Sequence, residues 1–158
     1  MGARRPGCQP PGALIAGAGA EDCRNLYEYG FNIGLAFQVA DDWLDAFGDA
    51  KVFGKPIGGD IVNSKKSWLT VRAFEKADDS TRKKLTAAMS MHADTEEEKK
   101  EKIAGVMAIY RALDVDSDAR KEIEALTRKA LSCAAKAVSG EKLETLEHFA
   151  NRLVGRTK

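Results

Sequence analysis

Hydrophobic residues recur at helical spacing along almost the whole chain, and this pattern predicts an all-α protein. The longest apolar segment covers residues 21–47. Apolar faces follow at Ile103, Val106, Met107, Tyr110 and Leu113, at Ile123, Leu126, Ala130 and Ala134, and at Leu143, Leu146, Phe149 and Leu153. Residues three or four positions apart lie on one side of a helix, so the spacing predicts a bundle of roughly six or seven helices. No stretch shows the alternation typical of a half-buried strand.

Glycine, proline and charge mark the expected helix boundaries. Residues 48–60 contain four glycines and Pro56, a composition that predicts a loop. We expect one helix from about Asp60 to Ala77, a charged connector over residues 76–84, and a short helix over residues 81–92. Thr95 followed by Glu98 has the capping-box spacing, which predicts a helix start.

Composition indicates one ordinary globular domain. The chain has 158 residues, of which 44% are hydrophobic, and this length is enough for one core. Residues 1–12 hold three of the four prolines. We expect them to form a disordered tail before a helical domain over residues 13–158.

Charge and cysteine content narrow the function classes. A net charge of +1 gives no basic field for nucleic acid or an anionic membrane surface. No segment has the length of a membrane span. The three cysteines form no C-x-x-C pair, which favours a reduced cytoplasmic protein over a disulfide framework or a zinc site.

Three aspartates stand in the long apolar segment without a nearby basic residue. Asp41, Asp42 and Asp45 have Arg24 and Lys51 as the first basic residues on either side. These lysine and arginine side chains are too far along the helix to neutralise the carboxylates by local pairing. Another group must therefore stabilise the three negative charges.

The helical wheel gathers the acidic residues on one stripe. Gly34, Gln38, Asp41 and Asp45 follow one another at separations of four, three and four residues, and Asp42 flanks them. The rest of the circumference is apolar. We therefore expect the helix to be buried except for this stripe, which would face a wet cavity.

Two hypotheses explain the acidic stripe. In the first, Asp41, Asp42 and Asp45 bind Mg²⁺, because carboxylate oxygens one turn apart converge on a hard cation that also shares phosphate oxygens with a substrate. In the second, Asp42, Asp45 and Asp49 cap helices or pair with a distant basic helix, since short acidic motifs are common and weakly specific.

A basic, glycine-bearing segment follows the aspartates. Lys55 lies within the stretch GKPIGGD, and Lys65 and Lys66 follow shortly after it. Backbone N–H groups of glycine-rich loops hold phosphate, and a lysine adds a mobile positive charge. An acidic metal-binding face followed by such a loop suits a metal-bridged diphosphate. The alternative is a surface turn with solvated lysines.

The stretches GLAFQVADDWLDAFGD, FGKPIGGD and IVNSKKSWL together resemble the second aspartate-rich region of the isoprenyl (polyprenyl) diphosphate synthases, especially the geranyl/farnesyl type. The similarity runs from Gly12 to the closing RLVGRTK. It implies the carboxy-terminal half of the isoprenoid synthase fold and a Mg²⁺-dependent prenyltransferase. Its partners would be allylic and isopentenyl diphosphates, and the family implies a homodimer.

The same resemblance implies a metal role for the aspartates. Asp41 would bind the Mg²⁺ that bridges the allylic diphosphate, with Asp42 and Asp45 supporting it. Together with Lys55, Asp41 and Asp42 would be the catalytic residues. The implied reaction is ionisation of the allylic C–O bond followed by attack of isopentenyl diphosphate on the carbocation.

The resemblance also implies a set of substrate contacts. Gln38 would face the substrate cavity. Lys55 and Lys65 would contact the diphosphate leaving group, and Asp60 would hold metal-bound waters or orient the lysines.

The chain departs from this family in length. Members are about twice as long and carry two aspartate-rich motifs, by that resemblance, whereas this sequence has only the second, since Asp78 and Asp79 lie in a hydrophilic connector. We therefore expect impaired catalysis and exposed apolar faces on the acidic helix. The alternative function is a non-catalytic helical interaction module that uses the faces at Ile103–Leu113 and Leu143–Leu153.

Overall fold

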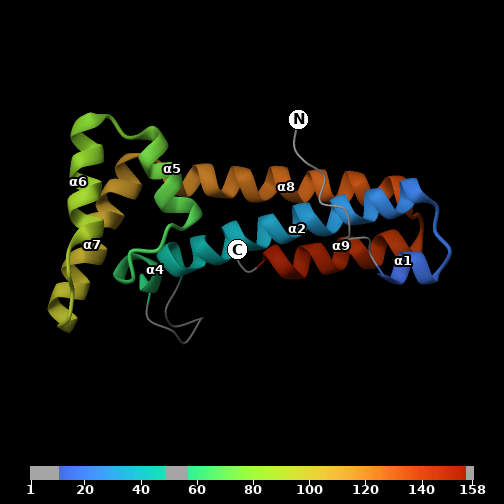
Figure 1. Ribbon diagram of the computed structural model, residues 1–158, viewed down its shortest axis with the longest axis horizontal. Helices are drawn as coiled ribbons and strands as arrows, with labels where there is room; N and C mark the ends of the chain where they lie inside the picture. The colour runs from blue at the N-terminus through green and yellow to red at the C-terminus, as the bar shows by residue number, and fades with distance from the viewer. Residues whose placement is uncertain (1–10, 49–56, 156–158) are drawn as a thin grey trace. The chain divides into compact units, whose positions relative to one another are not determined.

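The computed structural model describes residues 11–48 and 57–155, and this part of the chain is helical without a strand (Figure 1). The helices are α1 (Pro11–Ile15), α2 (Ala20–Phe47), α4 (Gly59–Val62), α5 (Trp68–Lys76), α6 (Asp79–Ser90), α7 (Glu96–Ala112), α8 (Val115–Ala137) and α9 (Glu141–Val154). The all-α prediction is confirmed. The described residues alone hold eight helices, more than the sequence pattern predicted.

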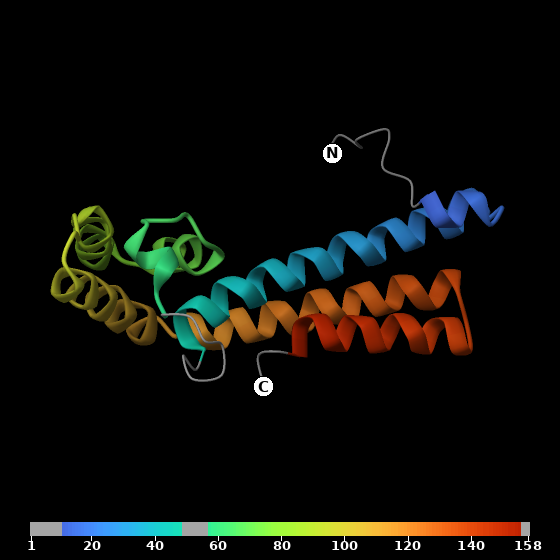
Figure 2. The ribbon, with the colours of Figure 1, turned by 90° about the horizontal axis from the view of Figure 1, so that it is seen from below.

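The described chain divides into two compact units, and α2 and α8 contribute to both. The first unit combines the chain up to Phe37 with residues Ile123–Gly155. Within it the parts of α2, α8 and α9 lie side by side in both views (Figures 1 and 2). The Tyr29 hydroxyl donates a 2.8 Å hydrogen bond to the Leu146 carbonyl, which ties α2 to α9.

Small side chains allow this close packing. Ala36 on α2, Ala130 and Ala134 on α8, and Ala150 on α9 are fully buried. The predicted apolar face of α8 therefore does enter a core. The predicted face of α9 differs at Phe149, whose side chain is exposed.

The second unit contains residues Gln38–Glu122 and all the described candidate site residues. Helix α7 packs against α4, α5 and α6. Its predicted apolar face supplies Val106 and Tyr110 to a core that also buries Leu69 and Leu85. The Tyr110 hydroxyl is hydrogen-bonded to the Thr70 hydroxyl at 2.8 Å.

The single helix predicted from Asp60 to Ala77 is wrong, because the structure breaks it into α4 and α5. Ser64 has a φ of 52°, a left-handed conformation that a helix interior does not permit. Ser67 then caps α5 by accepting a hydrogen bond from the Thr70 N–H at 3.3 Å. The break gives the chain a turn over residues 63–67, and this turn carries Lys65.

The next two helix starts follow their capping residues. Asp78 accepts a 2.7 Å hydrogen bond from the Thr81 N–H, so α6 begins at Asp79 and the charged connector is shorter than predicted. The capping box is confirmed, since Thr95 accepts from the Glu98 N–H and the Glu98 side chain accepts from the Thr95 N–H.

Helix α2 confirms the predicted helix over residues 21–47 but not its burial. Phe31 and Leu35 are 51% and 40% exposed. Phe31 lies seven residues and Leu35 three residues before Gln38, so both lie on the same side of the helix as Gln38. The Gln38 side chain is also exposed. An apolar circumference therefore does not guarantee burial, because burial depends on which elements pack against the helix.

Two sequence predictions lie largely outside the described residues. Of the expected tail, residues 1–12, only the last two residues are described, and they belong to α1, which begins at Pro11. Of the expected loop, residues 48–60, only the two ends are described. The domain boundary at residue 13 stays a prediction. Within the described ranges, no helix combines the length and apolarity needed to cross a membrane.

Candidate functional site

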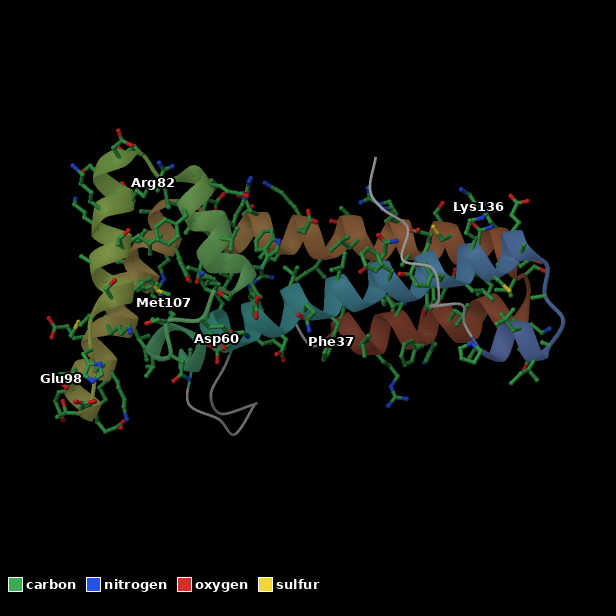
Figure 3. The ribbon with its side chains drawn as sticks, in the orientation of Figure 1. Phe37, Asp60, Arg82, Glu98, Met107 and Lys136 are labelled. Atoms are coloured by element: carbon green, nitrogen blue, oxygen red, sulfur yellow. The ribbon has the colours of Figure 1, made fainter. Side chains whose placement is uncertain are left out.

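Four of the six described candidate residues meet where the carboxyl-terminal end of α2 approaches α4 and the turn before α5. Asp42 and Asp45 come from the last two turns of α2, Asp60 from α4, and Lys65 from the turn. Figure 3 shows Asp60 beside the end of α2. Residues separated by up to 26 positions along the chain are thereby joined by hydrogen bonds.

Lys65 is held between two carboxylates. Its Nζ donates to Asp42 Oδ1 at 3.0 Å and to Asp60 Oδ2 at 2.8 Å. These hydrogen bonds, that to Asp60 first, raise the pKa of Lys65 well above its ordinary value. The Lys65 side chain is still 50% exposed. The result is a permanently charged ammonium group that is fixed in place and open to solvent.

Asp42 also anchors the start of α5. Its Oδ2 accepts a 2.7 Å hydrogen bond from the backbone N–H of Trp68, the first residue of the helix. A carboxylate at this end is favoured because the free N–H groups carry partial positive charge. One aspartate therefore connects three elements: α2, the turn with Lys65, and α5.

Asp45 anchors the start of α4 in a similar way. Its Oδ2 accepts a 2.8 Å hydrogen bond from the Asp60 N–H, and its backbone carbonyl accepts from the Gly58 N–H at 2.7 Å. Gly58 has a φ of 89°, which favours glycine. Burial raises the pKa of the Asp45 carboxyl, and the hydrogen bond from Asp60 opposes this change.

Asp41 differs from its two neighbours. Its side chain is exposed, and within the described part of the chain it forms no hydrogen bond or ion pair. Asp42 and Asp45 make hydrogen bonds to the starts of helices, and Asp42 also forms an ion pair. These are the contacts that the second hypothesis for the acidic stripe predicts. Across residues 11–48 and 57–155, no group of three histidine, cysteine, aspartate or glutamate side chains is placed to hold a metal ion by itself.

Trp43 fixes the last turns of α2 against α8. Its Nε1 donates a hydrogen bond to Asp116, and the Arg120 guanidinium lies 4.5 Å above its ring. Such a cation–π contact adds to the burial of the indole. Because Trp43 lies between Asp42 and Asp45 in the sequence, this contact holds the turns that carry both aspartates against α8.

The remaining predicted residues are not part of this hydrogen-bonded cluster. Gln38 lies on the exposed side of α2 one turn before Asp41. Lys55 lies outside the described residues, so its contribution stays a prediction. The structure thus joins Asp42, Asp45, Asp60 and Lys65.

Sequence reasoning missed Lys102 on α7. This lysine is only 3% exposed, and its Nζ donates to the Val62 carbonyl at 3.0 Å and to Ser64 Oγ at 2.8 Å. It thereby holds the turn that presents Lys65. The available clue was its spacing, four residues before Val106 and eight before Tyr110, which places it on the apolar face.

The cluster has the chemistry to bind an anion together with a divalent cation. A fixed, exposed ammonium offers positive charge to an oxyanion. Asp41 offers oxygen ligands close by in sequence, the type that Mg²⁺ prefers.

The relatives found by comparison with known proteins agree with one another in their descriptions. The sequence profile described as Polyprenyl synthetase matches residues 10–107. The geranylfarnesyl diphosphate synthase of Aeropyrum pernix is 36% identical over 148 residues, which cover 93% of this chain and 44% of that protein.

Solved structures agree with this similarity. A crystal structure of a geranylgeranyl pyrophosphate synthase superposes with a TM-score of 0.82 at 35% identity, covering 93% of this chain and 45% of that one. The enzyme of the same description from Corynebacterium glutamicum, complexed with isoprenyl diphosphate and magnesium, gives 0.76 at 29% identity, with coverages of 92% and 40%. The chain spans less than half the length of these relatives.

Proposed function

This chain belongs to the polyprenyl synthetase family, and on that premise we propose that it carries a diphosphate- and magnesium-binding part of an isoprenyl diphosphate synthase site. The reaction would be the condensation of an allylic diphosphate with isopentenyl diphosphate. The observation that carries the proposal is the position of Lys65, an exposed ammonium held by Asp42 and Asp60. The departing diphosphate gains negative charge, and a positive charge that is already fixed in place stabilises it without reorganisation.

The carboxylate oxygens at the end of α2 are suited to bind Mg²⁺ as a cofactor. Mg²⁺ is usually held by one or two carboxylates together with waters and substrate phosphates rather than by a complete protein cage. Asp41 has no protein partner in the described chain, and Asp45 is oriented by the Asp60 N–H, as metal-ligating carboxylates usually are. Asp41 and Asp45 would hold the ion, which would neutralise charge on the departing diphosphate.

The other residues would position and bind the substrate. Asp42 uses both oxygens on Lys65 and Trp68, so we assign it to positioning the lysine rather than to the metal. Asp60 orients Lys65 in the same way. Lys65 would contact the diphosphate as the allylic C–O bond breaks. We also propose that Lys55 and Gln38 make the substrate contacts predicted from the sequence.

Isothermal titration calorimetry with methylene diphosphonate, a stable diphosphate analogue, tests the proposal. We expect binding at least about tenfold tighter with Mg²⁺ than with EDTA, which corresponds to about 1.4 kcal/mol. Asp41→Ala should abolish this difference. Lys65→Gln should weaken binding in both conditions, because it removes the fixed ammonium.

Lys66→Gln is the matched control, since it removes the same charge one residue away and should leave the magnesium-dependent gain intact. Equal, weak binding with Mg²⁺ and with EDTA would contradict the proposal. That result would favour the non-catalytic interaction module.

A further inference from the structure

The second unit also contains a cavity that the proposed diphosphate site does not use. Its volume is about 790 Å³, and α4, α5, α6, α7 and the turns that precede α5 and α7 contribute to its lining. Volumes of this size are typical of small-molecule sites. Neither Asp42 nor Lys65 lines it.

The lining of this cavity is positively charged. Lys66, Lys99 and Lys102 line it, and no aspartate or glutamate does. Lys99 pairs with Glu96 at 2.7 Å. Within the described chain, Lys66 and Lys102 form no ion pair, so neither lysine has a carboxylate within ion-pair distance.

The absence of an ion-pair partner is most unfavourable for Lys102. Its side chain is almost fully buried, and its Nζ contacts only neutral oxygens, the Val62 carbonyl and Ser64 Oγ. An ammonium group has three donors, and burying its charge without an opposite charge is unfavourable. An anion in the cavity would compensate this charge.

The other lining groups indicate the kind of anion. The Ser90 hydroxyl can donate a hydrogen bond to its oxygens, and Phe74, Met89 and Met91 add apolar surface. A cavity of about 790 Å³ is far larger than an inorganic ion, given that one water occupies about 30 Å³.

We propose that this cavity binds a phosphorylated organic molecule, with its phosphate near Lys66 and Lys102 and its apolar part against Phe74, Met89 and Met91. A phosphate monoester carries nearly two negative charges at neutral pH, which matches the two unpaired lysines. The adjacent lysines divide between two sites, because Lys65 turns to Asp42 and Asp60 whereas Lys66 lines the cavity. The cavity site needs no metal ion.

Methyl-labelled methionine makes the cavity directly observable by NMR. Of the four methionines, Met89 and Met91 line the cavity, and Met107 is buried on α7 outside the lining. Titration of the full chain with hexyl phosphate in EDTA should shift the Met89 and Met91 signals saturably and leave Met107 unchanged. Inorganic phosphate and hexanol should each bind at least about tenfold more weakly, because each lacks half of the contacts.

Matched variants separate this site from the proposed diphosphate site. Lys66→Gln should weaken hexyl phosphate binding about tenfold or more, whereas Lys65→Gln should not affect it. Equal binding of hexanol, equal losses in the Lys65 and Lys66 variants, or shifts at Met107 alone would each overturn the proposal. Failure of the magnesium-dependent calorimetry would leave it standing, since no metal takes part.

Discussion

Ser64 is the residue on which the presentation of Lys65 depends. Its φ of 52° ends α4, and three elements meet at its hydroxyl. The Ser64 Oγ donates to the Met89 carbonyl on α6 at 2.6 Å and accepts from Lys102 Nζ on α7 at 2.8 Å. A buried lysine thus stabilises a turn whose next residue is the exposed lysine of the proposed site.

Replacing Lys102 with methionine tests this connection at the residue scale. The change keeps most of the apolar stem but leaves the Val62 carbonyl and the Ser64 hydroxyl without their donor. We expect the free energy of unfolding in urea to fall by about 1–3 kcal/mol, the usual effect of losing the partner of a buried polar group.

Lys100→Met is the control for Lys102→Met. Lys100 is exposed on the same helix, so its replacement should change the free energy of unfolding by less than about 0.5 kcal/mol. Equal effects of the two changes would show that the buried hydrogen bonds contribute nothing to stability.

At the scale of elements, Asp118 joins α5 to α8. It accepts hydrogen bonds from Arg72 Nε at 2.9 Å and from Lys76 Nζ at 2.8 Å. Both basic residues lie on α5, one turn apart, and Asp118 lies in the first turn of α8. The hydrogen bond from Lys76, followed by that from Arg72, lowers the pKa of the Asp118 carboxyl below its ordinary value of 3.8.

This lowered pKa predicts a pH-dependent contribution to stability. In the unfolded chain Asp118 binds its proton at a higher pH than in the folded protein, so the ionised form favours folding. The contribution is complete above the ordinary pKa of 3.8 and is lost as the pH falls through the lower folded value. Asp118→Asn should therefore reduce the urea midpoint at pH 7 and have progressively less effect below about pH 4.

Asp79→Asn is a suitable comparison for this pH series. Asp79 is 96% exposed and lies 3.8 Å from its only described ion-pair partner, Arg82. Its replacement should alter the midpoint little at any pH. A constant effect of Asp118→Asn between pH 7 and pH 2 would contradict the assignment of its stabilisation to ion pairing.

At the scale of the whole molecule, the 158 residues contain one D-D-x-x-D motif and span less than half the length of the relatives reported above. The carboxylates of α2 would hold a metal ion from one side of a diphosphate. Phe31 and Leu35 are exposed on the same helix, in agreement with the exposed apolar faces that we expected from the sequence.

We therefore expect this chain, assayed alone, to bind diphosphate but to condense it poorly. Ionisation of an allylic diphosphate needs charge stabilisation around the whole leaving group, and one acidic motif supplies only part of it. Incubation with dimethylallyl and isopentenyl diphosphates and Mg²⁺ should give prenyl product at rates several orders of magnitude below a common kcat of about 10 s⁻¹.

Asp41→Ala serves as the background for this assay, because any product made with α2 carboxylates should disappear in it. Product formation at ordinary enzyme rates from the unaltered chain would contradict the expectation. It would indicate that association between copies completes the site.

The sequence by itself determined the helical class, the extent of α2 and the start of α7, because these depend on short-range spacing. Side chains three or four residues apart share a face whatever surrounds them, and the Thr95 and Glu98 hydrogen bonds close within one turn. The motif residues Asp42, Asp45, Asp60 and Lys65 could be named for the same reason. They lie within a short, distinctive stretch of sequence.

Only the tertiary structure decided how those residues are used. Lys65 pairs with Asp42 and Asp60 rather than with Asp41, since the break at Ser64 turns it toward the end of α2. That break is held by Lys102, whose hydrogen bonds span 38 and 40 residues of sequence. Contacts over such separations depend on how α4 and α7 pack, and local periodicity carries no information about that packing.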